Sequence, residues 1–241
     1  MMNGIYKGKY FSVLGDSIST LYGYCPNGYE VFYNADKCFE ADVFSMGDTW
    51  WGKVIDGLGG KLLVNNSWSG SMVSKHRLCV IPSFGASDER TSSLGKDGIC
   101  PDVIMVYLGT NDWGASVKIK PEKGEENDVS VFLSAYRIML EKIYSNYENA
   151  EIWCFTLGTG KKSGKPTFEF LKSADKDRLV EYCEAIKACA KELDCRLIDL
   201  YADTEIEPFD TIDGYHPNAN GMSTIASAVI RMAEKFEEKS K

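Results

Sequence analysis

The sequence predicts an α/β fold in which a parallel β-sheet lies between two layers of helices. Short apolar segments alternate along the chain with longer segments of helical periodicity, which is the pattern of repeated β-α units. The apolar segments carry few polar residues, as in Val-Ile-Met-Val-Tyr-Leu at 103–108. Such strands are typical of a sheet that is covered on both faces. The two patterns together indicate a layered globular protein.

Five segments are predicted to be strands, because each is a short apolar run bounded by turn residues. They are Tyr10–Leu14, Lys61–Val64, Val103–Leu108, Glu151–Thr156 and Arg196–Leu200. Right-handed crossovers between consecutive parallel strands place helices on both faces of the sheet. The expected architecture is therefore a three-layer α/β/α sandwich of the flavodoxin-like type, with about five parallel strands.

Four segments are predicted to be amphipathic helices, because apolar residues recur in them at every third or fourth position. They are Thr49–Leu58, Ser130–Tyr147, Ala174–Leu193 and Ala219–Phe236. The first of these ends at two consecutive glycines, a common helix stop. No repeat, low-complexity linker or change in composition divides the 241 residues, so we expect a single domain over residues 1–241.

Composition excludes some classes of function. The net charge of −8 disfavours binding to nucleic acid, which needs a basic surface. No apolar stretch is long enough to span a membrane, and the N-terminal residues lack the apolar core of a signal peptide, so a cytoplasmic location is expected. The eight cysteines form no C-x-x-C motif, which indicates buried, reduced thiols rather than a zinc or redox site.

Polar motifs follow the first three predicted strands. They are Gly15-Asp16-Ser17, residues 65–70 (Asn-Asn-Ser-Trp-Ser-Gly) and residues 109–112 (Gly-Thr-Asn-Asp). Ligands of parallel sheets bind at the carboxyl ends of the strands, so we expect the three motifs to meet there. Glycines allow a close approach of backbone to ligand, and Asn111 adds a side-chain amide. This set of donors suits the developing oxyanion of ester hydrolysis.

A fourth motif lies near the C-terminus, where Asp213 precedes His216 by three residues. A serine presented on a turn, together with an aspartate and a histidine, is the inventory of a nucleophilic hydrolase. Each motif alone also occurs as an ordinary turn, and the interpretation depends on their combination and order. The other histidine, His76, is interpreted as a solvated loop residue, and two histidines without clustered carboxylates make a catalytic zinc site improbable.

In this order, the four motifs resemble the sequence blocks of the SGNH (GDSL-type) hydrolase superfamily of esterases and acylhydrolases. The resemblance extends from residue 11 to about residue 221. The matching segments are residues 15–19, with isoleucine in place of the usual leucine at 18, and residues 66–70, 109–112 and 213–217. The α/β-hydrolases also use the order Ser, Asp, His, but their G-x-S-x-G motif is absent from this sequence.

The resemblance implies a role for five residues. Ser17 would be the nucleophile, His216 the general base and then the acid, and Asp213 the residue that orients His216. The backbone N–H groups of Ser17 and Gly70 and the side chain of Asn111 would form the oxyanion hole. The reaction would use no metal and no cofactor.

The segment Leu21–Asp48 is long for a connection and rich in aromatic residues. Long connections often serve as binding loops, and aromatic faces can line an acyl pocket or stack on a sugar ring. Four aromatic residues in or beside the motifs are candidate substrate contacts: Tyr22, Tyr24, Trp68 and Trp113. The alternative is a loop whose aromatic residues only pack against each other. The glycine- and lysine-rich residues 158–166 depart from the phosphate-binding P-loop pattern and are expected to form a basic surface loop.

The sequence therefore predicts a serine esterase that acts on a small-molecule ester, such as an O-acetyl or other short acyl group on a carbohydrate. Two alternatives remain open. One is a lipase- or thioesterase-type acylhydrolase for longer acyl chains, and the other is a binding module that keeps the pocket without turnover. A flavodoxin-like nucleotide or flavin binder is disfavoured, because the motif at residues 15–17 lacks a phosphate-binding run.

Overall fold

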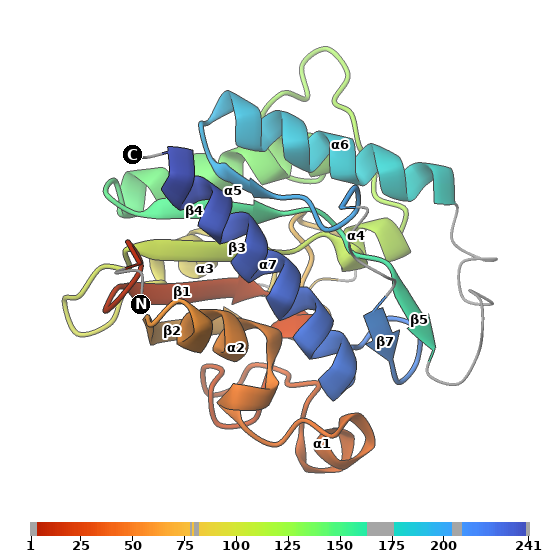
Figure 1. Cartoon of the computed structure of the whole chain (residues 1–241). Helices are drawn as coiled ribbons and strands as arrows, with labels where there is room; N and C mark the ends of the chain where they lie inside the picture. Colours follow the sequence, from red (N-terminus) through yellow and green to blue (C-terminus); the bar gives the residue numbers. More distant parts are fainter. Residues whose placement is uncertain (1–3, 78, 80–81, 163–175, 204–208, 240–241) are drawn as a thin grey trace.

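The computed structural model of the chain describes residues 4–77, 79, 82–162, 176–203 and 209–239. Its centre is a five-stranded parallel sheet with the order β2-β1-β3-β4-β6 (Figure 1). The strands are β1 (Tyr10–Gly15), β2 (Lys61–Ser67), β3 (Val103–Tyr107), β4 (Glu151–Phe155) and β6 (Arg196–Ile198). The predicted parallel α/β sandwich is confirmed, and all five predicted strands are present within a few residues of their expected ends.

Side chains of the central strands alternate between two apolar cores. Val103, Met105 and Tyr107 of β3 contribute to one core, and Ile104 and Val106 contribute to the other. All five are at most 2% exposed. The near-continuous apolar character of this strand follows from burial on both sides, because each face of a parallel sheet needs a helical cover.

Helices cover both faces of the sheet (Figure 1). On one face lie α2 (Trp50–Gly57) and α7 (Ala219–Lys239), and on the other lie α3 (Asp88–Ser92), α5 (Phe132–Asn146) and α6 (Lys176–Glu192). The four predicted helices correspond to α2, α5, α6 and α7. Residues 174–175, where the third of them was expected to begin, lie outside the described residues.

The segment Leu21–Asp48 contains regular structure that its composition does not indicate. It includes the helix α1 (Ala35–Ala41) and the 3-10 turn η2 (Met46–Asp48). The side chain of Asn34 caps α1 by accepting a hydrogen bond from the Lys37 N–H. An isolated helix of this length is marginal in water, so its formation depends on packing against the rest of the domain.

A second, two-stranded sheet pairs β5 (Gly160–Lys162) with β7 (Phe209–Thr211) in parallel. Residues 160–162 were expected to belong to a surface loop. Sequence periodicity does not predict this pair, because each of the two strands has only three residues and no alternating pattern marks them. Residues 163–166 of the same predicted loop lie outside the described residues.

Strand β2 is three residues longer than predicted, because its last residues are polar yet remain in the ladder. Ser67 pairs with Gly15 of β1. The Asn65 side chain donates to the Ser19 carbonyl oxygen at 2.9 Å, and the Ser67 hydroxyl donates to the Asn65 side-chain oxygen at 2.5 Å. These hydrogen bonds satisfy the buried polar groups, so the strand continues up to the edge of the sheet where the polar motifs lie.

Among the helices in the described part of the chain, none has the length and apolar character needed to span a membrane.

Candidate active site

Ser17 stands at the carboxyl end of β1, as the first residue of the 3-10 turn η1 (Ser17–Ser19). Asp16 caps this turn, because its carboxylate accepts a hydrogen bond from the Ile18 N–H at 3.0 Å. Gly15 is required before it, since a Cβ atom at this position would lie 2.6 Å from the Ser19 side chain and 2.8 Å from that of Ser67. The strand therefore stops abruptly and presents the Ser17 side chain at the sheet edge.

His216 and Asp213 lie in the loop between β7 and α7. The Nε2 atom of His216 is 2.9 Å from the Oγ of Ser17, and its Nδ1 atom is 2.6 Å from the Oδ2 of Asp213. The other carboxylate oxygen of Asp213 accepts the backbone N–H groups of Tyr215 and His216, each at 2.9 Å. The structure thus joins three residues that are separated by almost the whole sequence into one hydrogen-bonded chain.

The charge of Asp213 suits its place in the hydrogen-bonded series Asp213–His216–Ser17. Burial raises the pKa of its carboxyl, but the hydrogen bonds from the His216 ring and backbone outweigh burial and lower the pKa to about 2. The group is therefore ionised throughout the neutral range. It holds the proton of the imidazole on Nδ1, which leaves the Nε2 lone pair facing Ser17.

Three groups near the carboxyl ends of β1, β2 and β3 are candidate hydrogen-bond donors to a ligand: the backbone N–H groups of Ser17 and Gly70 and the side chain of Asn111. In the described part of the chain, no acceptor pairs with the backbone N–H of Ser17 or with that of Gly70. Asn111, in the short helix α4 (Thr110–Gly114) after β3, uses one amide N–H to bond the Ser71 carbonyl oxygen at 2.9 Å. This bond fixes the orientation of the amide and uses one of its two N–H groups, and the side chain lines the cavity described next. Gly70 has a φ of 79°, a left-handed conformation that favours glycine.

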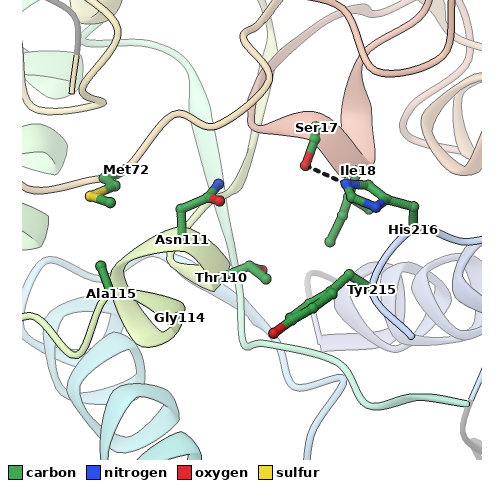
Figure 2. A pocket seen from close by; sticks show the side chains of 9 residues that line it. All are labelled: Ser17, Ile18, Met72, Thr110, Asn111, Gly114, Ala115, Tyr215 and His216. Carbon is green, nitrogen blue, oxygen red and sulfur yellow. Dashed lines mark hydrogen bonds between the residues drawn. The ribbon is translucent and has the colours of Figure 1, made fainter. Parts of the chain in front are cut away.

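A cavity of about 370 Å³ opens beside these groups. Its lining consists of Ser17, Ile18, Met72, Thr110, Asn111, Gly114, Ala115, Tyr215 and His216. Figure 2 shows the Ser17–His216 pair on one side of the cavity, and Met72, Asn111 and Ala115 on the opposite side. The cavity combines one reactive hydroxyl, one base and an amide donor with a largely apolar wall, which is the arrangement of a small-ligand site.

Comparison with known proteins agrees with this geometry. Residues 9–233 match the family model described as GDSL-like lipase/acylhydrolase. The chain belongs to this GDSL-like family. The predicted resemblance to GDSL-type hydrolases is thereby confirmed, and so is the predicted enzyme class, a carboxylic ester hydrolase. Among functionally curated proteins, no sequence matches the chain.

Solved structures of similar fold include members of the same broad class. A candidate GDSL-like lipase from Bacteroides ovatus is 26% identical, with a TM-score of 0.72 over 95% of this chain and 99% of that one. The aryl esterase of M. smegmatis is 15% identical, with a TM-score of 0.63 over 95% and 99% of the two chains. A carbohydrate esterase family 2 enzyme from Myceliophthora fergusii is 18% identical, with a TM-score of 0.59 over 94% of this chain and 66% of that one. The last two similarities show a shared fold.

Four aromatic residues predicted as substrate contacts do not line the cavity of this GDSL-like hydrolase. Trp68 stacks on Tyr29, with ring centroids 3.9 Å apart, and Tyr24 packs against Trp51. Trp113 is only 6% exposed and contacts the ring of Tyr215 from the core side, whereas Tyr22 is 76% exposed. The lining residues that sequence reasoning did not single out as substrate contacts are Met72, Thr110, Gly114, Ala115 and Tyr215.

Arg90 is a part of the site that the sequence did not reveal. Its guanidinium is fully buried and donates to the carbonyl oxygens of Gly15 and Asn66 at 2.9 and 2.8 Å. It also donates to the Ser71 hydroxyl at 2.7 Å and to the Ser83 carbonyl oxygen at 2.6 Å. One side chain thus links the strand before the nucleophile to the loop that follows Gly70. Burial lowers its pKa to about 10, so it remains charged at neutral pH.

Asp112 fixes the same loop from the side of β3. One carboxylate oxygen accepts the Val73 N–H at 2.8 Å, and the other accepts the Ser74 N–H at 3.0 Å. Burial raises the pKa of this carboxyl to about 6, although the hydrogen bonds oppose the increase. Because Asn111 and Asp112 are adjacent, the motif at residues 109–112 both supplies an amide donor and anchors the loop that carries Gly70.

Asp16 makes stability depend on pH. Burial raises its pKa to about 7, and its Oδ2 atom has no hydrogen-bond partner in the described structure. The folded protein therefore keeps a proton that the unfolded chain releases near pH 4. This contribution to the free energy of unfolding is fully present below about pH 4 and is lost as the pH rises through about 7.

Replacement of Asp16 by asparagine is expected to remove this dependence. The amide oxygen can still cap Ile18, and an uncharged NH2 replaces the unpartnered oxygen. We expect the D16N variant to be more stable than wild type at pH 8 by about 1–3 kcal/mol, and to differ little from it at pH 4. Urea unfolding at both pH values measures this, with the exposed Asp36→Asn as control. If the free energy of unfolding changed by the same amount between pH 4 and pH 8 in D16N and in wild type, Asp16 would not be the source of the pH dependence.

Proposed function

We propose that this enzyme is a Ser17-dependent esterase that cleaves a short acyl group, such as O-acetyl, from a small ester, in particular an acylated carbohydrate. The observation that carries the proposal is the series of hydrogen bonds from Asp213 through His216 to Ser17, which ends at a cavity lined by Ser17, His216 and Asn111. A nucleophile, its base and an orienting carboxylate within hydrogen-bond distance satisfy the geometric requirement for acyl transfer.

In the acylation half-reaction, the Ser17 Oγ attacks the ester carbonyl carbon while the His216 Nε2 accepts the hydroxyl proton. The developing oxyanion receives hydrogen bonds from the Ser17 and Gly70 N–H groups and from the Asn111 amide. Collapse of the tetrahedral intermediate breaks the bond to the alcohol oxygen, and His216 returns the proton to that oxygen. Ionised Asp213 stabilises the imidazolium that exists between the two transfers.

Deacylation repeats the sequence with water. His216 removes a proton from the water as its oxygen attacks the acyl carbon, and the same donors hold the second oxyanion. The bond between the acyl carbon and the Ser17 Oγ then breaks, and the proton on His216 passes to Ser17. The products are the free acid and the regenerated enzyme.

The cavity wall supports a short acyl group. Gly114 and Ala115 offer no large side chain, while Ile18 and Met72 supply apolar surface. The volume of about 370 Å³ is near the lower end of the range for small-ligand sites, which is about 300–1,000 Å³. Tyr215 contributes an aromatic ring beside His216, which suits contact with the sugar ring of an acylated carbohydrate. A carbohydrate esterase of family 2 shares this fold, and this similarity agrees with a carbohydrate substrate.

Hydrolysis of p-nitrophenyl esters of increasing acyl length tests the proposed substrate class. We expect kcat/KM to be highest for acetate and to fall steadily from butyrate to octanoate. A preference for octanoate would instead support the alternative hypothesis of an acylhydrolase for longer chains, which is favoured by the similarity to a candidate lipase. Release of acetate from an acetylated oligosaccharide is the second measurement. Activity on the aryl acetate without any on the oligosaccharide would refute the carbohydrate part of the proposal.

Asn111→Ala is expected to lower kcat by about 10²- to 10³-fold with a small effect on KM. The amide donor acts on the oxyanion, which exists in the transition state and not in the bound ester, so the loss is confined to the chemical step. Steady-state kinetics with p-nitrophenyl acetate measure both constants. The matched control is the exposed Asn149→Ala. A kcat within threefold of wild type would remove Asn111 from the oxyanion hole.

A further inference from the structure

The segment Leu21–Asp48 is called the aromatic segment below. A short stretch of it, Glu30–Tyr33, contacts three loops of the proposed catalytic site. The Glu30 carbonyl oxygen accepts the N–H of Ser69, which precedes Gly70, at 2.8 Å. The Phe32 N–H donates to the Thr20 hydroxyl at 3.0 Å, and that hydroxyl donates to the Ser17 carbonyl oxygen at 2.9 Å. This stretch therefore bonds to the loop that carries Gly70 and to the turn that carries Ser17.

The third contact is with the histidine loop. The Tyr33 hydroxyl donates to the Pro217 carbonyl oxygen at 2.6 Å, immediately after His216. The ring of Phe32 lies flat on the imidazole of His216, with centroids 3.4 Å apart and planes 10° apart. The side chain of His216 is only 16% exposed. One imidazole face is thus covered by a ring whose own backbone is bonded to the nucleophile turn.

We propose that Phe32 is a positioning residue for the catalytic base: its ring face keeps the imidazole of His216 aligned between Asp213 and Ser17, and stabilises the imidazolium formed during acyl transfer. The inference rests on the proposed function, because it assigns Phe32 a part in the same Ser17–His216 chemistry. It adds a residue that lies outside the four sequence motifs and that lines no part of the cavity.

Two physical effects follow from the stacking. A flat ring in parallel contact hinders rotation of the imidazole about its side-chain bonds, so Nε2 stays directed at the Ser17 hydroxyl. The π-face also attracts a cation more than a neutral ring, so the phenyl group favours the imidazolium over the imidazole. An aliphatic side chain of similar volume can fill the space, but it provides neither a flat face nor a quadrupole.

Other charged and titratable groups lie around His216 and its carboxylate partner. Those that interact with it or with its carboxylate partner are Asp213 and Tyr215 of its own loop, Ser17 of the nucleophile turn, and Tyr33 and Lys37 of the aromatic segment. Lys37 also lies 5.8 Å from the Phe32 ring centroid and forms an ion pair with Glu40 at 2.5 Å. Two of these groups, Lys37 and Tyr33, contact the Phe32 ring themselves, and Phe32→Tyr keeps an aromatic ring beside both of them.

The kinetic test compares Phe32→Leu and Phe32→Met, which remove the aromatic face, with Phe32→Tyr, which keeps it. We expect kcat to fall about 3- to 30-fold in the Leu and Met variants, with KM changed less than threefold. The acid limb of the kcat/KM profile should move about half a pH unit toward acid, because the imidazolium loses its contact with the π-face of Phe32. Phe32→Tyr should resemble wild type in all three quantities.

A measurement that does not depend on turnover separates this proposal from the proposed function. The chain has two histidines, so the imidazole C–H signals in a proton NMR titration can be assigned with a His76→Gln variant. We expect the midpoint of the His216 signal to move toward acid in Phe32→Leu and to stay in place in Phe32→Tyr, while the His76 midpoint is the same in all variants. A shift of this kind supports the role of Phe32 even if hydrolysis depends on another residue.

An unmoved His216 midpoint in both aliphatic variants would overturn the proposal, as would an equal loss of kcat in the Tyr and Leu variants. Thermal unfolding of each variant shows whether it folds. If Phe32→Leu unfolds, the same comparison is made between Phe32→Met and Phe32→Tyr. Equal hydrolysis rates in Ser17→Ala and wild type would count against the proposed function. The NMR titration alone decides whether the Phe32 ring affects His216.

Discussion

Replacement of Ser17 by alanine is expected to lower kcat by about 10⁵- to 10⁶-fold without loss of the fold. The hydroxyl is the atom that forms the acyl bond, so its removal eliminates the covalent route instead of weakening one contact. Its only hydrogen bond in the described structure is with the His216 ring, and β1 and the turn around it are held by Gly15, Asp16 and Thr20. The melting temperature should therefore stay within a few degrees of wild type.

The measurement is hydrolysis of p-nitrophenyl acetate by both proteins, with a thermal melt of each. Ser227→Ala is a matched control, because Ser227 is an exposed serine in the middle of α7. The control should retain full activity. Comparable rates in Ser17→Ala and wild type would contradict the mechanism, and no hydrolysis by either protein on any ester would favour a binding module without turnover.

The second large effect is expected for Asp213→Asn, which should lower kcat by about 10⁴-fold at neutral pH. The Oδ1 atom of Asp213 accepts two backbone N–H groups, so an asparagine would keep its oxygen there and direct its NH2 toward the Nδ1 of His216. The imidazole would then accept at Nδ1 and carry its proton on Nε2. In that tautomer His216 cannot accept the proton of Ser17.

Steady-state kinetics of Asp213→Asn between pH 6 and 9 measure this effect, and the exposed Asp56→Asn on α2 is the control. Because the pKa of Asp213 is about 2, the carboxylate of wild type stays charged over this whole range. The loss should therefore be present at every pH tested. A loss smaller than tenfold would show that Asp213 does not set the tautomer of the base.

The strand ends could be predicted from sequence because each combines an apolar run with a turn motif. At Gly15 and Gly109 the change from apolar to small and polar residues marks the sheet edge. The same signal placed the end of β2 three residues too early. Asn65, Asn66 and Ser67 are polar but buried, and only their tertiary hydrogen bonds allow them to remain in the strand.

The contents of the site could be predicted only in part. Ser17, Gly70, Asn111, Asp213 and His216 lie in recognisable motifs, and the fold brings them to one edge of the sheet. Arg90 lies in a polar stretch whose residues otherwise suggest the surface, and its burial is compensated by carbonyl oxygens from distant segments. A single sequence holds no local signal for such a long-range network.

The aromatic segment shows the same limit. Its composition indicates a binding or self-packing loop, and proximity to the motifs in sequence is the only basis for predicting which of its residues contact a substrate. In the structure Tyr22 and Tyr24 are exposed, whereas Phe32 stacks on His216 from 184 residues away in sequence. Which aromatic residue meets the site depends on the path of the chain through α1 and on the hydrogen bonds of Thr20 and Tyr33, which a pattern of residue types does not encode.

The most direct test of the Ser17 mechanism is covalent labelling with a fluorophosphonate, followed by peptide mass spectrometry. The tryptic peptide that spans residues 10–37 holds Ser12, Ser17 and Ser19, so fragmentation identifies the modified hydroxyl. We expect one adduct per chain, on Ser17, with loss of esterase activity in proportion to labelling and no adduct in His216→Ala. An adduct on a different residue that accounts for the loss of activity, or full activity after complete labelling of Ser17, would contradict the account.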